Sequence, residues 1–252
     1  MTLGILFLAG FLSGVINAIA AGGALLAFPA MLAAGLSPLT ATITSHLAMW
    51  PGQLSALIAG KGDLKAVPKK YFVLLTPWLL GGALGIFLLS YTSSETFNKL
   101  VPWLLTFTVA LFIIQPYMQK HLTRPVHLRP RASQIIIWLA VFLVAIYAGY
   151  FGIGVGLMLL TLYGFSRIKS IYQIIALKNL SGFLITLSAT IFFGLQNKIA
   201  WQEGLVLAFG SLVGGYFGAH FIHKISPPVV RVVVSAVGVI LVVICFKSYS
   251  WY

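Results

Sequence analysis

Long apolar runs alternate with short polar gaps along most of the chain. A helix that crosses a bilayer needs roughly 20 mostly apolar residues. The pattern predicts spanning helices at about 39–59, 70–91, 99–118, 134–151, 171–193, 203–223 and 229–247. The chain is therefore expected to be an all-α polytopic membrane protein.

Two longer apolar stretches are interrupted by small and polar residues. Residues 3–34 contain Asn17 and the run Ala-Ala-Gly-Gly-Ala at 20–24, and residues 134–165 contain four glycines between Gly149 and Gly156. Each stretch is too long for one helix and too short for two full spans. We expect each to form a helix and a half-helix, folded as a re-entrant hairpin. The fold class is then about eight transmembrane helices plus two half-helices.

An internal repeat with a constant offset of 133 residues relates the two interrupted stretches. This offset places 81–85 (Gly-Gly-x-x-Gly) on 214–218, Gly23 on Gly156 and His46 on Asn179. The alternative is a chance coincidence of glycines in an apolar chain. The repeat predicts a first transmembrane unit at 1–118, a basic loop at 119–133 and a second transmembrane unit at 134–252.

Composition excludes most soluble classes of protein. Hydrophobic residues make up 60% of the 252 residues and charged residues 8%, against about 45–50% and about 25% in an average soluble protein. So few charges cannot coat a soluble globule, which excludes a soluble enzyme, a disordered tail, a coiled coil and a disulfide scaffold. The net charge of +13 does not indicate nucleic acid binding, because the basic residues lie in gaps between apolar runs.

The distribution of basic residues predicts the topology. If both interrupted stretches are hairpins, twelve basic residues fall on one side and Lys99, Lys198 and Lys247 on the other, with Lys178 inside a span. If each stretch crosses once, the split falls to ten against five. The stronger bias favours hairpins and places the loop 119–133 in the cytoplasm. Both termini are then extracytoplasmic and the repeats are inverted, a recurrent plan of secondary transporters.

The two breaks predict an anion site. A half-helix that follows a break presents unpaired amides with partial positive charge at its N-terminus, and such amides hold anions. We assign this role to Gly22 and Gly23 in the first repeat and to Gly154 and Gly156 in the second. The alternative is that these glycines only let helices pack closely.

The segment after the first break has an unusually polar start. Ser37-Pro38 predicts a helix entry, and Thr44, Ser45 and His46 follow as candidate substrate ligands. The alternatives are hydroxyls bonded to the preceding turn and a histidine that only packs. Helical spacing places four polar or polarisable residues on one face of this segment: Thr42, His46, Met49 and Gln53.

Lys178 is the strongest single candidate. It lies near the middle of the 171–193 segment, where a lysine costs at least about 2.5–3.5 kcal/mol on insertion scales. None of the three acidic residues lies in that region, so the ammonium can pair with a bound anion. Asn179 and Ser181 follow as predicted donors to the same anion. The alternative is that Lys178 extends to the cytoplasmic surface.

Other chemistries lack their sequence signatures. The chain has no CxxC, no HExxH and no carboxylate–histidine cluster, so no metal is expected. Walker and GxGxxG motifs are absent, so neither ATP nor another cofactor is expected. An intramembrane serine protease built on Ser181 needs a histidine on a later helix, and His220 and His223 lie at a segment end. The chain is not expected to be an enzyme.

Glycine and proline motifs recur at 10–14 (Gly-Phe-Leu-Ser-Gly), 21–29, 35–38, 41–46 and 152–157. Over nearly the whole chain they resemble the sulfite exporter TauE/SafE family. Members of that family usually carry a richer glycine run than this chain, and often Thr-Asn where it has Ser45-His46. The resemblance implies a multi-pass permease of the bacterial inner membrane for sulfite, organosulfonates or other small anions.

We therefore expect a secondary transporter of a small anion, such as sulfite, an organosulfonate or a related organic acid. The anion is expected to bind between inverted repeats and to cross by alternating access. The expected partners are the anion and the lipid bilayer, and a homo-oligomer is compatible with the sequence. The alternative is a membrane accessory or scaffold protein without flux of its own, with both glycine breaks as packing contacts and Lys178 at the surface.

Overall fold

The computed structural model describes residues 2–19, 22–122, 130–164, 168, 170–220 and 227–249, and every regular element in these ranges is a helix. The long helices are α1 (Thr2–Ile19), α3 (Pro38–Ala59), α5 (Leu75–Tyr91), α6 (Ser94–Leu122), α7 (Pro130–Tyr150), α9 (Ile171–Leu195), α10 (Trp201–His220) and α11 (Pro227–Tyr249). The short elements are α2 (Ala24–Ala33), α4 (Lys61–Lys65), the 3-10 helix η1 (Lys69–Leu74) and α8 (Val155–Gly164). Residues 123–129 of the basic loop 119–133, and His223, lie outside the described residues.

Each interrupted stretch contains a long helix followed by a half-helix, as predicted. The half-helices α2 and α8 have 10 residues each. At about 1.5 Å per residue such a helix spans about half of a bilayer core of about 30 Å. Their placement as re-entrant hairpins in a bilayer stays a prediction.

The surface of the helical bundle is apolar and its interior is partly polar. Leu80 and Phe209 are 62% and 63% exposed, whereas Thr44, His46 and Ser211 are buried. This distribution fits a lipid environment better than water. Two described stretches, Lys69–Tyr91 and Ile171–Leu195, are long and apolar enough to cross a membrane by themselves. The number of about eight spans stays a prediction.

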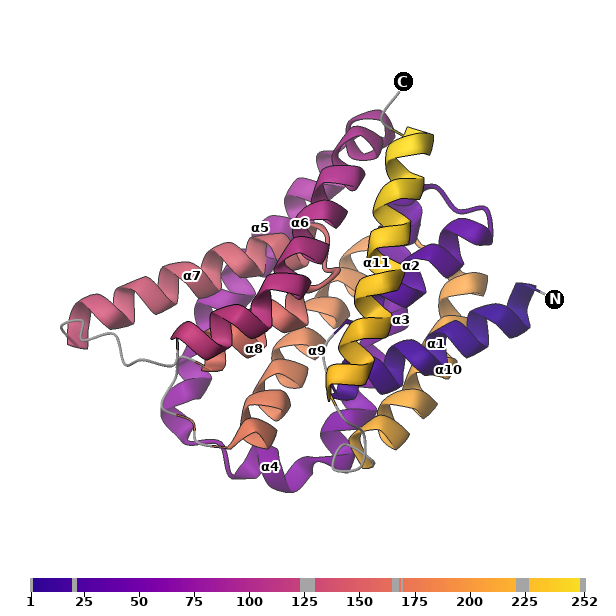
Figure 1. Ribbon diagram of the computed structural model, residues 1–252. Coiled ribbons are helices and arrows are strands. Elements are labelled where there is room, and N and C mark those ends of the chain that lie inside the picture. Colours follow the sequence, from indigo (N-terminus) through magenta and orange to yellow (C-terminus); the bar gives the residue numbers. More distant parts are fainter. Residues whose placement is uncertain are drawn as a thin grey trace.

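Helices from one half of the chain pack against helices from the other half. α1 packs along α10, α7 packs along α5, and α3 contacts α9 in the middle of the bundle (Figure 1). Glycines make the outer pairs close: a methyl group on Gly214 would meet the Phe11 carbonyl, and one on Gly81 would meet the Phe142 carbonyl. Helices in lipid commonly associate through such small residues.

Two buried hydrogen bonds occur at equivalent places in the two halves. Trp78 Nε1 donates to the Ser181 carbonyl over 2.7 Å. Ser211, which is 133 positions after Trp78, donates to the carbonyl of Ala48, which is 133 positions before Ser181. The first half therefore donates one of these bonds to the second half, and the second half donates the equivalent bond to the first.

A third hydrogen bond joins two equivalent residues to each other. Thr186 Oγ1 donates to Gln53 Oε1 over 2.9 Å, and the two residues are 133 positions apart. The predicted repeat makes Gln53 and Thr186 equivalent, and equivalent residues meet near the axis of a repeat, so the axis is expected between α3 and α9. The inverted orientation of the halves in a membrane and the boundaries 1–118 and 134–252 stay predictions.

The predicted constant offset is wrong for the first helices of each half. Ala24 and Val155, which begin α2 and α8, are 131 positions apart, and so are Ile19 and Tyr150, which end α1 and α7. Gly23 is therefore equivalent to Gly154 rather than to Gly156. The second half has two more residues between its half-helix and the next long helix.

Candidate functional site

A cavity of about 60 Å³ lies where the two helix breaks meet α3 and α9. At about 10–15 Å³ for each water molecule, it has room for on the order of four water-sized groups. Six of the ten predicted site residues line it: Gly22, Ser45, His46, Gly154, Gly156 and Lys178. They come from both breaks and from both central helices, α3 and α9.

The second break presents the N-terminus of α8 to the cavity. Gly152 and Gly154 have φ values of 75° and 80°, which glycine adopts without strain. The first bond of the new turn runs from Leu157 N to the Gly154 carbonyl over 3.1 Å. The amides of Val155 and Gly156 donate to no acceptor within the described ranges. This end of α8 therefore offers unpaired donors with partial positive charge.

The first break places the start of α2 on the same cavity. Leu25 N donates to the Gly22 carbonyl over 3.0 Å, and both Gly22 and Ala24 line the cavity. Gly23 does not line it. A methyl group on Gly23 would meet the Ser13 carbonyl, so this glycine permits close approach of α1, as the alternative interpretation held.

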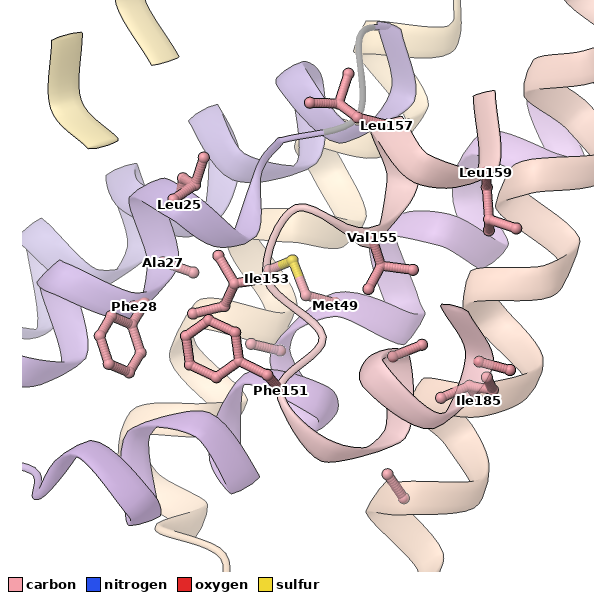
Figure 2. Close-up of a cluster of buried hydrophobic side chains, with 14 of the residues drawn as sticks. Leu25, Ala27, Phe28, Met49, Phe151, Ile153, Val155, Leu157, Leu159 and Ile185 are labelled. Carbon is pink, nitrogen blue, oxygen red and sulfur yellow. The ribbon is translucent and has the colours of Figure 1, made fainter. Parts of the chain in front are cut away.

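An apolar layer holds the two breaks against each other. Figure 2 shows Ile153 and Phe151 directed toward α2, where Ala27 and Phe28 lie. The rings of Phe28 and Phe151 meet edge to face, with their centroids 6.2 Å apart. All of these side chains are fully buried. The layer fixes the position of one half-helix relative to the other.

Lys178 is a buried cation on the cavity wall. Its side chain is only 3% exposed, so it does not reach the surface as the alternative interpretation required. The ammonium donates to the carbonyl of Asn17, in the last turn of α1, where helix carbonyls carry partial negative charge. An ammonium has three donors, and the other two have no partner among the described residues.

No carboxylate compensates this charge. Glu95 pairs with Lys99 over 2.7 Å at the exposed start of α6. Asp63 and Glu203, the remaining acidic residues of the sequence, lie in the first turns of α4 and α10. Lys178 therefore makes no ion pair in the described part of the chain.

His46 is a second polar group that lacks a partner. It is 1% exposed, lines the cavity, and its Nε2 atom has no hydrogen bond in the described structure. A buried polar atom without a partner costs about 1–3 kcal/mol. Ser45 differs, because its hydroxyl donates to the Thr42 carbonyl over 2.7 Å. Ser45 thus follows the alternative interpretation, in which a hydroxyl of this segment bonds to the preceding turn of its own helix.

Three further predicted residues lie outside the cavity. Thr44 Oγ1 accepts from Ala200 N over 3.1 Å. Ser181 Oγ donates to the Leu177 carbonyl over 2.9 Å and lies 2.8 Å from the Tyr163 hydroxyl. Asn179 is buried, and its Oδ1 has no partner in the described structure. Thr44 and Asn179 are each one position from a residue that lines the cavity, and neighbouring helix positions point in different directions. Ser181, three positions after Lys178, instead faces Tyr163.

Residues that the sequence analysis did not predict also line the cavity. The face predicted for α3 is present, since Met49 and Gln53 line the cavity with His46, although Thr42 does not. On α9 the same spacing of four residues leads from Lys178 to Gly182 and Thr186 and could have identified both. Trp78, from α5, had no such signal. The other omitted lining residues are Asn17, Ala24, Ala148, Gly152, Val155, Leu159 and Ile185.

Comparison with known proteins gives matches over nearly the full length of the chain. "Probable membrane transporter protein YfcA" of Escherichia coli (strain K12) is 29% identical over 94% of this chain and 88% of its own length. A "Probable membrane transporter protein" of Haemophilus influenzae is 28% identical over 99% and 96%. "Probable membrane transporter protein ORF9" of a Sinorhizobium species is 27% identical over 96% and 91%. No solved structure matches the chain.

The model of one protein family spans both breaks and all or most of each long helix. It is the model for sulfite exporter TauE/SafE, and it matches residues 6–245. That range includes every residue that lines the cavity. The chain therefore belongs to the sulfite exporter TauE/SafE family, a family of membrane transporters.

Proposed function

We propose that the protein is a secondary transporter, acting as a permease or exporter in the bacterial inner membrane. Its substrate is a small oxyanion such as sulfite, an organosulfonate or a related organic acid. The observation that carries the proposal is the buried ammonium of Lys178, which lines the cavity and has no carboxylate partner. A buried charge without a counterion is expensive, by several kcal/mol, and a bound anion removes that cost.

The chemistry of the cavity wall suits an oxyanion. Donors come from Lys178 and from the amides that begin α8, and the unpartnered nitrogen of His46 adds a further polar contact. Sulfite has four non-hydrogen atoms, which matches a volume of about 60 Å³. Apolar side chains of Leu159 and Ile185 complete the wall and could accept the carbon chain of a small sulfonate.

The position of the cavity supports alternating access. It lies beside the contact between Gln53 and Thr186, close to the axis that relates the two halves. Rocking one half against the other about such a site would open it to either side of the membrane. The proposal keeps the loop 119–133 in the cytoplasm and the two halves inverted.

The other two functions have less support. A non-transporting accessory protein was expected to have Lys178 at the surface and both breaks as packing contacts, but Lys178 is buried and both breaks border the cavity. An intramembrane serine hydrolase needs a bond from Ser181 to a histidine. The described hydrogen bonds of the Ser181 hydroxyl go to Leu177 and Tyr163.

The test is uptake of labelled sulfite into proteoliposomes, with and without an imposed membrane potential. We expect saturable uptake by the unmodified protein and a loss of at least about tenfold in Lys178→Ala, because removing one partner of a buried charge pair costs about 2–5 kcal/mol. Lys198→Ala is the matched control, since Lys198 is exposed and donates to the Ser90 carbonyl. Normal uptake by well-folded Lys178→Ala, or no uptake of sulfite or methanesulfonate by the unmodified protein, would contradict the proposal.

A further inference from the structure

Two hydroxyl groups hold the break that precedes α8. The Tyr147 hydroxyl lies 3.2 Å from the carbonyl oxygen of Ile153, and Thr108 Oγ1 lies 3.3 Å from the same oxygen. The two hydroxyls also contact each other. Thr108 comes from α6 and Tyr147 from α7, and neither lines the cavity. The transport mechanism outlined above gives them no role.

The direction of the Ile153 carbonyl fixes the direction of the next amide. The described chain has no cis peptide bond, and in a planar trans peptide the C=O and N–H groups point in opposite directions. Each hydroxyl donates one proton, and the nearer acceptor for Thr108 is the Leu104 carbonyl at 2.9 Å. Tyr147 therefore donates to Ile153, and Thr108 contacts the Tyr147 hydroxyl and keeps it in place. Together they hold the carbonyl on the side of α6 and α7. The N–H of Gly154 therefore points the other way, and Gly154 lines the cavity.

This peptide could turn over if the hydroxyls were absent. Ile153 lies between Gly152 and Gly154, which both have positive φ, and glycine tolerates a wide range of backbone angles. A reversed peptide would present the carbonyl oxygen of Ile153 to the cavity. Beside the start of α8, that oxygen would replace a donor by an acceptor and would repel an anion.

We propose that Thr108 and Tyr147 are positioning residues that set the affinity for the transported anion. They keep the Ile153–Gly154 peptide oriented so that the Gly154 amide joins those of Val155 and Gly156 in facing the anion. Successive amides next to a residue of positive φ form an anion-binding concavity. The inference rests on the proposed function and adds the residues that prepare its binding site.

The first break, which precedes α2, lacks this pair of hydroxyls. Ile16 occupies the position equivalent to Tyr147, 131 residues earlier, and Leu241 occupies the position equivalent to Thr108, 133 residues later. Both side chains are apolar and buried. The two breaks are therefore not interchangeable, and the second one carries the oriented donors.

The first test is the kinetics of sulfite uptake by the double variant Thr108→Val/Tyr147→Phe. We expect KM to rise about fivefold to tenfold, as for the loss of about one hydrogen bond, with a maximal rate within about twofold of the unmodified protein. Thr108→Ser keeps a hydroxyl and should preserve KM. Tyr150→Phe is the matched control, because this α7 hydroxyl contacts Thr92 Oγ1 at 3.2 Å instead of the break.

The second test observes the peptide itself. Ile153–Gly154 is the only Ile–Gly pair in the sequence, so labelling isoleucine with ¹³C at the carbonyl and glycine with ¹⁵N selects one peptide for NMR. We expect its carbonyl resonance to move in the double variant and not in Tyr150→Phe. We also expect sulfite to shift the Gly154 amide resonance of the unmodified protein.

The possible failures are distinguishable. An unmoved carbonyl resonance in the double variant, or an unchanged KM for sulfite, would overturn the positioning role. A lack of sulfite uptake by the unmodified protein would instead contradict the proposed function. In that case the carbonyl resonance still decides whether the two hydroxyls hold the break.

Discussion

At the scale of single residues, the cavity combines different groups from equivalent positions. Lys178 is equivalent to Ser45, and Asn179 is equivalent to His46. The second half thus contributes the cation and the first half the histidine, while Asn179 lies outside the cavity. The two halves therefore contribute different side chains at equivalent positions, and the proposed preference for an anion rests on this difference.

Replacing Gln53 by glutamate tests the sign of this preference. The Gln53 side chain accepts from Thr186 and lines the cavity. In Gln53→Glu a negative charge would occupy nearly the same volume and would repel an anion, so we expect sulfite uptake to fall at least about tenfold. Gln202→Glu makes the same change at an exposed position of α10 and should transport normally. Equal uptake by the two variants would refute an anion site in this cavity.

At the scale of elements, close packing through glycine keeps the long helices together. A methyl group on Gly85 in α5 would lie 2.9 Å from both the Ile146 carbonyl carbon and the Tyr150 nitrogen of α7. These are backbone atoms, which cannot move aside as a flexible side chain can. The α5–α7 pair therefore depends on the absence of a side chain at this position.

Gly85→Ala is expected to lower the denaturation midpoint in detergent. In a helix alanine is intrinsically favoured over glycine by about 1 kcal/mol, but overpacking costs typically about 1–3 kcal/mol, so we expect net destabilisation. Gly4→Ala is the matched control, because Gly4 is an exposed residue of α1 with nothing within 4 Å of the added carbon. It should leave the midpoint unchanged or raise it. A midpoint for Gly85→Ala at or above that of Gly4→Ala would contradict the packing account.

At the scale of the whole molecule, the sequence predicted the helices better than the cavity. Apolar runs located the long helices, and glycine runs located both breaks, because these features are local. Trp78 and Thr186 reach the cavity from other helices, which no local pattern shows. The predicted constant offset of 133 failed because the second half has two additional residues between α8 and α9, so the helices before them match at an offset of 131. Thr44 and Ser181 show the same limit, since tertiary contacts decided which polar groups face the cavity.

The predicted inversion of the two halves can be tested by labelling from one side. In a Cys245→Ala background, we expect Gly62→Cys to be protected from a membrane-impermeant maleimide in intact cells and Gln196→Cys to be labelled. Both positions are exposed, so any difference between them reports sidedness. It follows from the bias of basic residues, which places the 60–70 segment with the 119–133 loop in the cytoplasm. Labelling of both positions, or of Gly62→Cys alone, would contradict the topology.

The central claim is that an anion occupies the cavity between the two half-helices. The most direct measurement is a crystal structure of the protein with selenite, a close analogue of sulfite whose selenium can be located by anomalous scattering. We predict a selenium peak beside Lys178 and His46, with the selenite oxygens within hydrogen-bonding distance of the amides that begin α8. A cavity without selenium at saturating selenite, or selenium bound only at the protein surface, would contradict the account.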